Sequence, residues 1–263
     1  MSTRSEGPLR GRVALVTGGS RGVGRGIVLR LASDGAAVAV NYRRDADAAA
    51  DVVREIQTRG GIARAYGAAI GDDEAVRSMV AQIRADLGGV SIVVSNAGSA
   101  SRGRTVTDTG LDEYRSLLDV HALGPIALVQ ELMPDLRSAD RSDVVMISSA
   151  TVTSTPARSA PYTMAKAAME TCMLTIAREE RANGVRANIV APGLVETEMG
   201  RRLVSAATAG GSMTDLQAAS PFGRVCTPAD VAGVVAFLVS QDASYLTGQR
   251  VMVDGGGPDV SIF

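Results

Sequence analysis

Tyr162 and Lys166 are the residues whose types and spacing most directly suggest chemistry. They lie four residues apart in the segment "YTMAK", inside a stretch whose apolar periodicity predicts a helix, so their side chains share one helix face. A free phenol has a pKa of about 10, and a nearby ammonium lowers that pKa by stabilising the phenolate. Lys166 is the only lysine, since all the other residues in the Lys and Arg total of 27 are arginine. The pair predicts proton exchange by Tyr162 at neutral pH, against the alternative of an incidental surface pair.

A glycine-rich segment near the N-terminus predicts a phosphate-binding turn. The segment "TGGSRGVG", residues 17–24, follows an apolar run and precedes a helical pattern. Its glycines would allow a tight turn, close approach of the backbone to a pyrophosphate, and close packing of the helix on the strand. The N–H groups at the helix start would then face the phosphates. A glycine-rich turn without a ligand is the alternative. The residues expected to line this turn are Gly18, Ser20, Arg21, Gly22, Val23 and Gly24.

The elements that must position these residues alternate along the chain. Short apolar runs predict strands over 12–17, 36–42, 62–68, 90–98, 142–149, 186–193 and 249–256. Helical periodicity separates them over 22–33, 45–59, 73–87, 111–137, 159–183 and 228–240. This alternation predicts an α/β fold: a single doubly wound Rossmann-type domain over 1–263, with a parallel seven-stranded sheet and helices on both faces. Residues 1–8 are expected to be flexible.

Composition narrows the class of protein. The 263 residues are 46% hydrophobic and 21% charged with a net charge of −1, which is typical of a globular protein that attracts neither nucleic acid nor an anionic membrane. No apolar run reaches the ~18 residues of a membrane span, and "MSTRSEGPLR" lacks the apolar region of a secretory signal. One histidine and two distant cysteines make neither a metal cluster nor a disulfide framework. We therefore expect a cytoplasmic protein without a metal.

The chain resembles the short-chain dehydrogenase/reductase family. The glycine turn, "SNAG" at 95–98, "YTMAK", and "APGLVET" at 191–197 occur in the order and spacing of that family, over about residues 9 to 257. Within it, the segment "RVCTPADVAGVVAFLVSQDASYLTGQRVMVDGG" is most like 3-oxoacyl-[acyl-carrier-protein] reductases. The resemblance implies a nicotinamide cofactor and hydride transfer between a ketone and a secondary alcohol. It also implies a homotetramer.

The resemblance assigns roles around the catalytic pair. Ser149, at the end of the run 142–149, matches the serine that orients the substrate carbonyl, and its hydroxyl would donate to developing oxyanion charge. Ser148 is the alternative, because successive side chains of a strand point to opposite faces. Lys166 would also hydrogen-bond the nicotinamide ribose. Further cofactor contacts are implied for Asn96, Ala97, Gly98, Pro192, Gly193, Val195 and Thr197.

The end of the second apolar run bears on the choice of cofactor. An acid there holds the ribose 2′-OH of NAD and repels a 2′-phosphate, whereas this chain has Asn41, Tyr42 and Arg43. Arg43, together with Arg21 of the glycine turn, predicts preference for NADP(H), with NAD(H) as the second choice. The position that commonly contacts the adenine amine is alanine here, which leaves Ile70 to provide apolar packing.

His121 departs from the family pattern. It stands where the family usually has the asparagine that holds a water of the proton relay to Lys166. It lies within 111–137, where "LG" and Pro125 predict a local break in the helix. Neutral imidazole donates from one nitrogen and accepts at the other, so it could hold the same water. A pH–rate profile would then show an inflection near the reference pKa of histidine, about 6.5. Simple packing of the imidazole is the alternative.

The sequence therefore predicts an NADP(H)-dependent oxidoreductase acting on a small-molecule or thioester-linked carbonyl substrate, with 3-oxoacyl thioesters among the candidates. Residues 198–222 would form a lid over the substrate, by resemblance. A non-catalytic dinucleotide-binding regulator on the same fold is the alternative, and Ser149, Tyr162 and Lys166 together argue against it. A structural subunit of a larger reductase is a third possibility.

Overall fold

The computed structural model describes residues 7–207, 214, 216–217, 220 and 222–257, which include one parallel seven-stranded sheet. Its strand order is β3-β2-β1-β4-β5-β6-β7. The strands are β1 (Val13–Val16), β2 (Ala37–Tyr42), β3 (Ile62–Gly67), β4 (Ile92–Ser95), β5 (Ser142–Ile147), β6 (Val185–Pro192) and β7 (Arg250–Val253). The predicted Rossmann-type fold is confirmed, including the strand over 62–67, which is the weakest of the sequence patterns.

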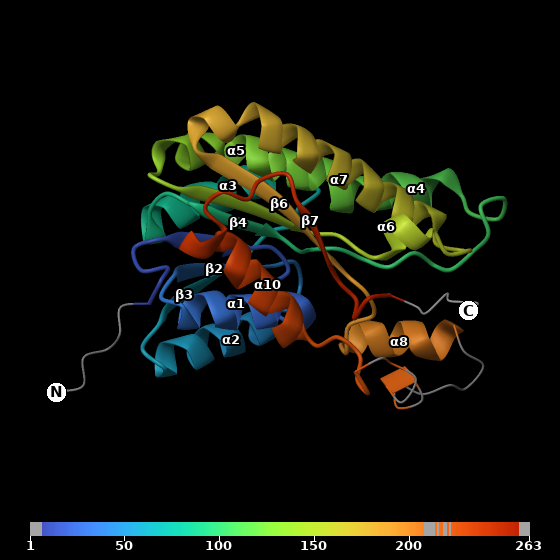
Figure 1. Ribbon diagram of the computed structural model, residues 1–263. Helices are drawn as coiled ribbons and strands as arrows, with labels where there is room; N and C mark the ends of the chain where they lie inside the picture. The colour runs from blue at the N-terminus through green and yellow to red at the C-terminus, as the bar shows by residue number, and fades with distance from the viewer. Residues whose placement is uncertain (1–6, 208–213, 215, 218–219, 221, 258–263) are drawn as a thin grey trace.

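Helices cover both faces of the sheet (Figure 1). The face with α3 (Asp73–Leu87), α5 (Gly124–Ser138) and α7 (Ala160–Glu179) encloses one buried apolar cluster. The opposite face, with α1 (Gly22–Ser33), α2 (Ala46–Thr58) and α10 (Pro228–Val239), encloses another. The shorter elements are α4 (Leu111–Leu118), α6 (Thr151–Ser154), α8 (Glu198–Ala207) and the 3-10 turns η2 (Arg181–Asn183) and η3 (Gln241–Ala243).

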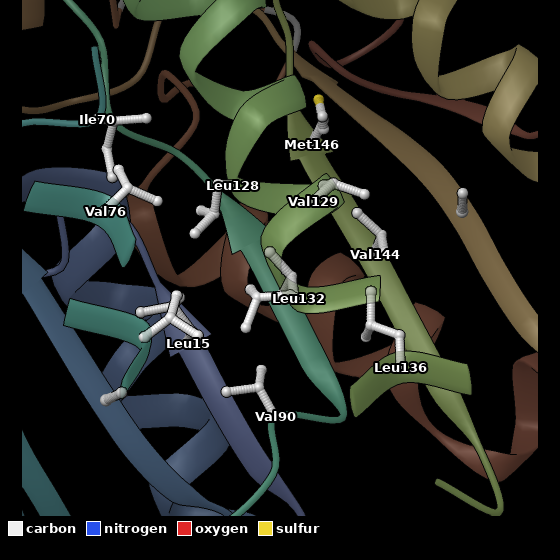
Figure 2. Close-up of a cluster of buried hydrophobic side chains, with 14 of the residues drawn as sticks. Leu15, Ile70, Val76, Val90, Leu128, Val129, Leu132, Leu136, Val144 and Met146 are labelled. Atoms are coloured by element: carbon white, nitrogen blue, oxygen red, sulfur yellow. The ribbon is translucent and has the colours of Figure 1, made fainter. Parts of the chain in front are cut away.

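Strand alternation divides the apolar residues between the two faces. In β1, Leu15 joins the cluster under α3 and α5, whereas Ala14 and Val16 join the cluster under α1 and α10. Figure 2 shows Leu15 near Val90 and Leu132, at the meeting of β1, β4 and α5. A sheet buried on both faces needs strands that are apolar at nearly every position. The strands could be predicted from the sequence because such continuous apolar runs are easily recognised.

The helical stretch predicted over 111–137 is interrupted at the expected place. A π segment, η1 (Asp119–Leu123), joins α4 to α5, and α5 begins with Gly124 and Pro125. A Cβ at position 124 would lie 2.2 Å from the carbonyl oxygen of Ile70, so only glycine allows this close approach. The wider π turn contains His121, and such turns are frequent at functional sites.

Two regions of the sequence interpretation lie partly outside the described residues. The lid predicted over 198–222 begins with α8, and its residues 208–213, 215, 218–219 and 221 are outside the description. The segment 1–8, expected to be flexible, is described only from Gly7, and Leu9 just beyond it is buried and donates its N–H to Asp34. The short helix α6 and the turn η3 were not anticipated.

Candidate active site

The carboxyl ends of four strands bring the proposed site residues to one edge of the sheet. The glycine turn follows β1, Asn96 follows β4, Ser149 follows β5, and the segment from Gly193 to Thr197 follows β6. The strand order changes direction between β1 and β4, and this point is where open α/β sheets bind their ligands. Residues up to 179 positions apart, from Gly18 to Thr197, therefore border one site.

Ser149 and Tyr162 are joined through their hydroxyl groups. The side chain of Ser149 interacts with the phenol of Tyr162, on α7, and the Ser149 Oγ accepts from the N–H and hydroxyl of Thr151, at 3.2 and 2.9 Å. Burial raises the pKa of Tyr162, and the hydrogen bond with Ser149 opposes that rise. The phenol is therefore protonated at neutral pH and stands beside a second hydroxyl.

Ser148 points away from this pair. Its hydroxyl donates to the carboxylate of Glu170 within the protein, and its side chain is buried. The two serines at the end of β5 thus have opposite orientations, as strand alternation requires. Of the two alternatives left by the sequence, the geometry places Ser149, not Ser148, against Tyr162.

Lys166 lies one helical turn beyond Tyr162 and is buried with an exposed fraction of 4%. Its ammonium donates to the carbonyl oxygen of Ile147 at 2.6 Å and lies 5.8 Å from the centroid of the Tyr162 ring. Burial lowers the pKa of Lys166 to about 8, while the charge of Glu170 raises it. The prediction that the pKa of Tyr162 is lowered is wrong for this structure, because burial of the phenol raises that pKa.

His121 packs directly against the catalytic tyrosine candidate. The rings of His121 and Tyr162 meet edge to face, with centroids 5.1 Å apart. A Cβ at position 98 would lie 2.3 Å from the His121 Cε1, so glycine at that position makes room for the ring. The Nε2 atom lies 2.8 Å from the carbonyl oxygen of Ser99 and 3.2 Å from the Ser99 backbone nitrogen, and the Nδ1 atom is buried without a hydrogen-bond partner in the described protein.

The pKa of His121 corrects a second sequence expectation. Burial, and then the charge of Lys166, lower the pKa of His121 from 6.5 to about 3, against a smaller opposing effect of its hydrogen bond with Ser99. His121 is therefore neutral throughout the physiological range. An inflection near pH 6.5 in a pH–rate profile is no longer expected, because the histidine does not titrate there.

The glycine turn has the shape that a pyrophosphate requires. Gly18 and Gly22 have φ values of 62° and 56°, a region that glycine adopts without strain. A Cβ on Gly24 would lie 2.2 Å from the carbonyl oxygen of Gly18, so this glycine permits α1 to pack directly against the turn. The residue before α1 makes no side-chain cap, and the first turn of α1 contains no acid. The residues present therefore fit a dinucleotide phosphate at the positive end of α1.

Thr17 and Asn96 fasten the glycine turn to the neighbouring strand. The Thr17 hydroxyl accepts from the N–H groups of Asn96 and Ala97, both at 2.9 Å. The Asn96 side-chain amide donates to the carbonyl oxygens of Thr17 and Gly18, at 2.9 and 3.2 Å. Asn96, for which a cofactor contact was predicted, therefore holds the glycine turn beside the end of β4. Thr17 is the first residue of the glycine motif and is fully buried. Its role was not predicted from the sequence, because that role depends on contacts with β4 and the residues that follow it.

Asn41 and Ile70 lie beneath the site with their side chains directed inward. Asn41 accepts from the Gly18 N–H at 3.2 Å, donates to the Ala68 carbonyl oxygen at 3.0 Å, and is 1% exposed. The Ile70 side chain belongs to the core and lies near Val76 in Figure 2. Both were expected to contact the cofactor. The Asn41 side chain supports the glycine turn through Gly18, and the Ile70 side chain packs in the apolar core.

The remaining cofactor candidates border the same edge. Arg21 and Arg43 are exposed, Ser20 is buried, and Tyr42 and Val23 are partly buried. Among the described residues, neither of these two arginines forms an ion pair, and both are exposed to solvent. A Cβ added to Gly22 would lie 3.5 Å from the methyl carbon of Thr197. The segment after β6 therefore lies against the glycine turn. Pro192, Gly193, Val195 and Thr197 therefore close one side of the site.

Two charged residues behind the site were missed by sequence reasoning. Glu170 is one helical turn beyond Lys166, and Arg250 of β7 donates from Nε to both of its carboxylate oxygens, at 2.9 and 3.0 Å. The spacing of Lys166 and Glu170 could have indicated their proximity, because residues four apart share a helix face. The contribution of Arg250 had no local signal, since it comes from 80 positions away.

Comparison with known proteins identifies the family to which this site belongs. A family model described as enoyl-(acyl carrier protein) reductase matches residues 18–257. Versicolorin reductase stcU of Emericella nidulans is 36% identical over 263 residues, covering 97% of this chain and 99% of that protein. The chain belongs to the short-chain dehydrogenase/reductase family. It is thus an oxidoreductase of the class that acts on CH–OH groups, and the family resemblance inferred from the motifs is confirmed.

Other members of the family share nearly the full length of this short-chain dehydrogenase/reductase. The 3-oxoacyl-[acyl-carrier-protein] reductase FabG of Staphylococcus aureus is 31% identical over 243 residues, or 92% of this chain and 96% of that protein. The structure of the angucycline C-6 ketoreductase LanV with bound NADP superimposes with a TM-score of 0.86 at 32% identity, covering 95% of this chain and 96% of that one. Among the described residues of this reductase-family member, no helix is long and apolar enough to span a membrane.

Proposed function

We propose that this protein is an NADP(H)-dependent oxidoreductase that reduces a ketone to a secondary alcohol, with 3-oxoacyl thioesters among its candidate substrates. The observation that carries the proposal is the pairing of the Ser149 hydroxyl with the phenol of Tyr162, with the ammonium of Lys166 buried one helical turn away. Two hydroxyl donors at one point are what a carbonyl oxygen needs as it gains charge. The relatives add support, since LanV is a ketoreductase with bound NADP and FabG a 3-oxoacyl reductase.

The protein's own groups would carry out the proton chemistry. NADPH, when bound, would supply the hydride to the carbonyl carbon. Ser149 would donate to the carbonyl oxygen and orient it, and Tyr162 would give its proton to that oxygen as the negative charge develops. Because burial raises the pKa of Tyr162, the phenol is in the acid form before the reaction. Lys166, whose pKa burial lowers to about 8, is suited to return a proton to the phenol.

The cofactor would lie along the edge formed by the strand ends. The glycine turn and the start of α1 would hold the pyrophosphate, Asn96, Ala97 and Gly98 would line the centre, and Lys166 would bond the nicotinamide ribose. Val195 and Thr197 would hold the carboxamide. Asn41 would act from below by supporting the turn through Gly18, and Ile70 would provide apolar packing.

Preference for NADPH over NADH rests on the end of β2. The residue at the position of the NAD-binding acid is Asn41, and its amide is occupied by the backbone of the turn and of β3. The exposed guanidinium groups of Arg21 and Arg43 would pair with the 2′-phosphate. No carboxylate at the end of β2 would repel that phosphate, since Tyr42, Arg43 and Arg44 follow Asn41.

We also propose that His121 takes the place of the family's relay asparagine. Its Nε2–H would donate to the Ser99 carbonyl oxygen, which leaves the buried Nδ1 as an acceptor for a water linked to Lys166. His121→Asn is then expected to retain turnover, and His121→Leu to lose it with little change in NADPH affinity. Turnover by His121→Leu equal to that of the wild type would show that His121 only fills space.

The remaining proposals concern organisation. We treat 1–263 as one dinucleotide-binding and catalytic domain, with 198–222 as a lid over the substrate, in a cytoplasmic homotetramer. Exposed apolar side chains support an association of subunits: Leu111 on α4 is 66% exposed and Met164 on α7 is 42% exposed. Light scattering on the purified protein measures the mass in solution, and a monomer would contradict the tetramer.

The test of the function is NADPH oxidation with a panel of ketones that includes a 3-oxoacyl thioester. We expect the wild type to oxidise NADPH with at least one ketone. Tyr162→Phe keeps the ring packed against His121 but removes the proton donor, so turnover should fall by at least ~10²-fold while NADPH affinity stays within a few-fold. Turnover at the wild-type rate in Tyr162→Phe, with chemistry limiting, would remove Tyr162 from the mechanism. NADPH binding without oxidation of any ketone would favour the regulator.

A further inference from the structure

Three residues with ionisable side chains lie along one buried face of α7. Tyr162, Lys166 and Glu170 follow one another at intervals of four residues, and Lys166 and Glu170 are 4% and 8% exposed. Tyr162 and Lys166 belong to the proposed mechanism, whereas Glu170 does not contact the reacting groups. A carboxylate is rarely buried unless it is paired, and its partners indicate what it does.

The partners of Glu170 lead back to the catalytic serine. Its carboxylate accepts from the Ser148 hydroxyl and from the Arg250 Nε. Arg250 in turn donates from Nη2 to the carbonyl oxygen of Ser149 at 3.0 Å. One guanidinium therefore joins a carboxylate on α7 to the backbone at the end of β5, and both serines there are held, Ser148 by its side chain and Ser149 by its carbonyl oxygen.

Stability alone is a weak reason for this arrangement. A buried ion pair often contributes no more than well-packed apolar residues of the same volume, because both charges lose their hydration. An aliphatic residue at position 170 would also leave Ser148 without its acceptor and Lys166 without a compensating negative charge. The Glu170–Arg250 pair is therefore better explained by its contacts with Ser148 and Ser149.

The charge of Glu170 also acts on Lys166. The titratable and charged groups that interact with Lys166 are Tyr162 and Glu170 on α7 and His121 on η1, with Arg250 of β7 behind Glu170. His121 is neutral above a pKa of about 3, and Tyr162 is held protonated by burial, which raises its pKa. Glu170 is therefore the negative charge that opposes the effect of burial on Lys166.

We propose that Glu170 and Arg250 are positioning residues of the catalytic site. They hold the end of β5 so that Ser149 faces Tyr162, and they keep one negative charge a helical turn from Lys166. This inference rests on the proposed function for its effect on turnover. Its electrostatic part concerns the protein alone and is testable without a substrate.

The single lysine makes the electrostatic part directly measurable. Protein grown with isotope-labelled lysine gives one side-chain NMR signal, that of Lys166, and its titration in the wild type should have a midpoint near 8. Glu170→Gln removes the negative charge and should lower that midpoint. Arg250→Met leaves the carboxylate uncompensated and should raise it, so the two variants move the midpoint in opposite directions.

A matched control is available at the C-terminal end of the same helix. Glu180, just after α7, is paired with Arg137 of α5 at 2.6 and 2.9 Å, but this pair does not contact the catalytic groups. Glu180→Gln should leave the Lys166 midpoint unchanged. Thermal melts monitor folding, and Arg250→Gln replaces Arg250→Met if the latter does not fold. A Lys166 midpoint that is the same in the wild type, Glu170→Gln and the Arg250 variant would overturn the electrostatic part.

Turnover tests the positioning part. In Glu170→Gln and the Arg250 variant, kcat for a ketone should fall roughly 10- to 100-fold because Ser149 is misplaced, while the KM for NADPH changes little. An unchanged kcat in both variants would overturn this part. If the wild type reduces no ketone while the Lys166 midpoint shifts as expected, the proposed function fails and the electrostatic coupling stands. If the wild type is active and neither variant changes midpoint or kcat, only this inference fails.

Discussion

The only histidine of the chain should make the protein less stable as the pH falls below neutrality. His121 is 2% exposed, and its pKa is lowered from 6.5 to about 3 by burial and by Lys166. Between these two values the unfolded chain binds a proton that the folded chain does not. Stability from this residue is therefore fully present above pH 6.5 and is lost as the pH falls towards 3.

The magnitude follows from the linkage relation. Lowering the pH to 5 places the unfolded histidine about 1.5 pH units below its pKa, while His121 in the folded protein remains neutral. Each pH unit corresponds to about 1.4 kcal/mol, so the free energy of unfolding should decrease by about 2 kcal/mol between pH 7 and pH 5. Replacement by asparagine, which does not titrate, should remove this contribution.

Urea unfolding at pH 7 and pH 5 measures this difference, followed by far-ultraviolet circular dichroism because the chain contains no tryptophan. The pH-dependent loss should be about 2 kcal/mol larger in the wild type than in His121→Asn, at one protein concentration. Comparing losses cancels the carboxylates that both proteins share. Equal losses in the two proteins, or an imidazole NMR signal that titrates near 6.5 in the folded wild type, would refute this account of His121.

Two further predictions concern the cofactor. Gly24→Ala should weaken NADPH binding at least about tenfold, because the added Cβ would lie 2.2 Å from a carbonyl oxygen of the turn. Fluorescence titration measures this binding. Gly110→Ala is the control and should bind NADPH normally, because its Cβ would meet nothing within 4 Å. Arg43→Ala and Arg21→Ala should each reduce the kcat/KM preference for NADPH over NADH about tenfold, because a charge-assisted hydrogen bond is lost. Exposed Arg77 on α3 gives the control Arg77→Ala, and an unchanged preference in the Arg43 and Arg21 variants would contradict their role.

The sequence predicts best those features that depend on neighbouring residues. The glycine turn, the shared helix face of Tyr162 and Lys166, and the break around His121 are all local, and each is present in the structure. The alternation of apolar strands and helices was likewise sufficient for the parallel sheet. These features need only backbone geometry and the apolar period.

Features that depend on burial or on distant partners were not predictable in the same way. The sign of the Tyr162 pKa shift was wrong because the burial of the phenol is a property of the folded chain. Ser149 was assigned from the resemblance, whereas the partner of Ser148, the carboxylate of Glu170, was not predicted. Asn41 was expected to contact the cofactor because of its position, and its amide bonds the backbone of the glycine turn and of β3. Arg250 reaches Glu170 only because β7 pairs with β6 beside α7.

The most direct test of the central claim follows the hydride itself. The wild type is incubated with NADPH carrying deuterium at the transferable position of the nicotinamide, together with a ketone from the panel, and the product is analysed by mass spectrometry. Reduction by the proposed route places the deuterium on the carbon of the new alcohol in the wild-type reaction and yields almost none with Tyr162→Phe. Tight NADPH binding without a deuterated alcohol from any ketone would contradict the claim that this protein is a ketone reductase.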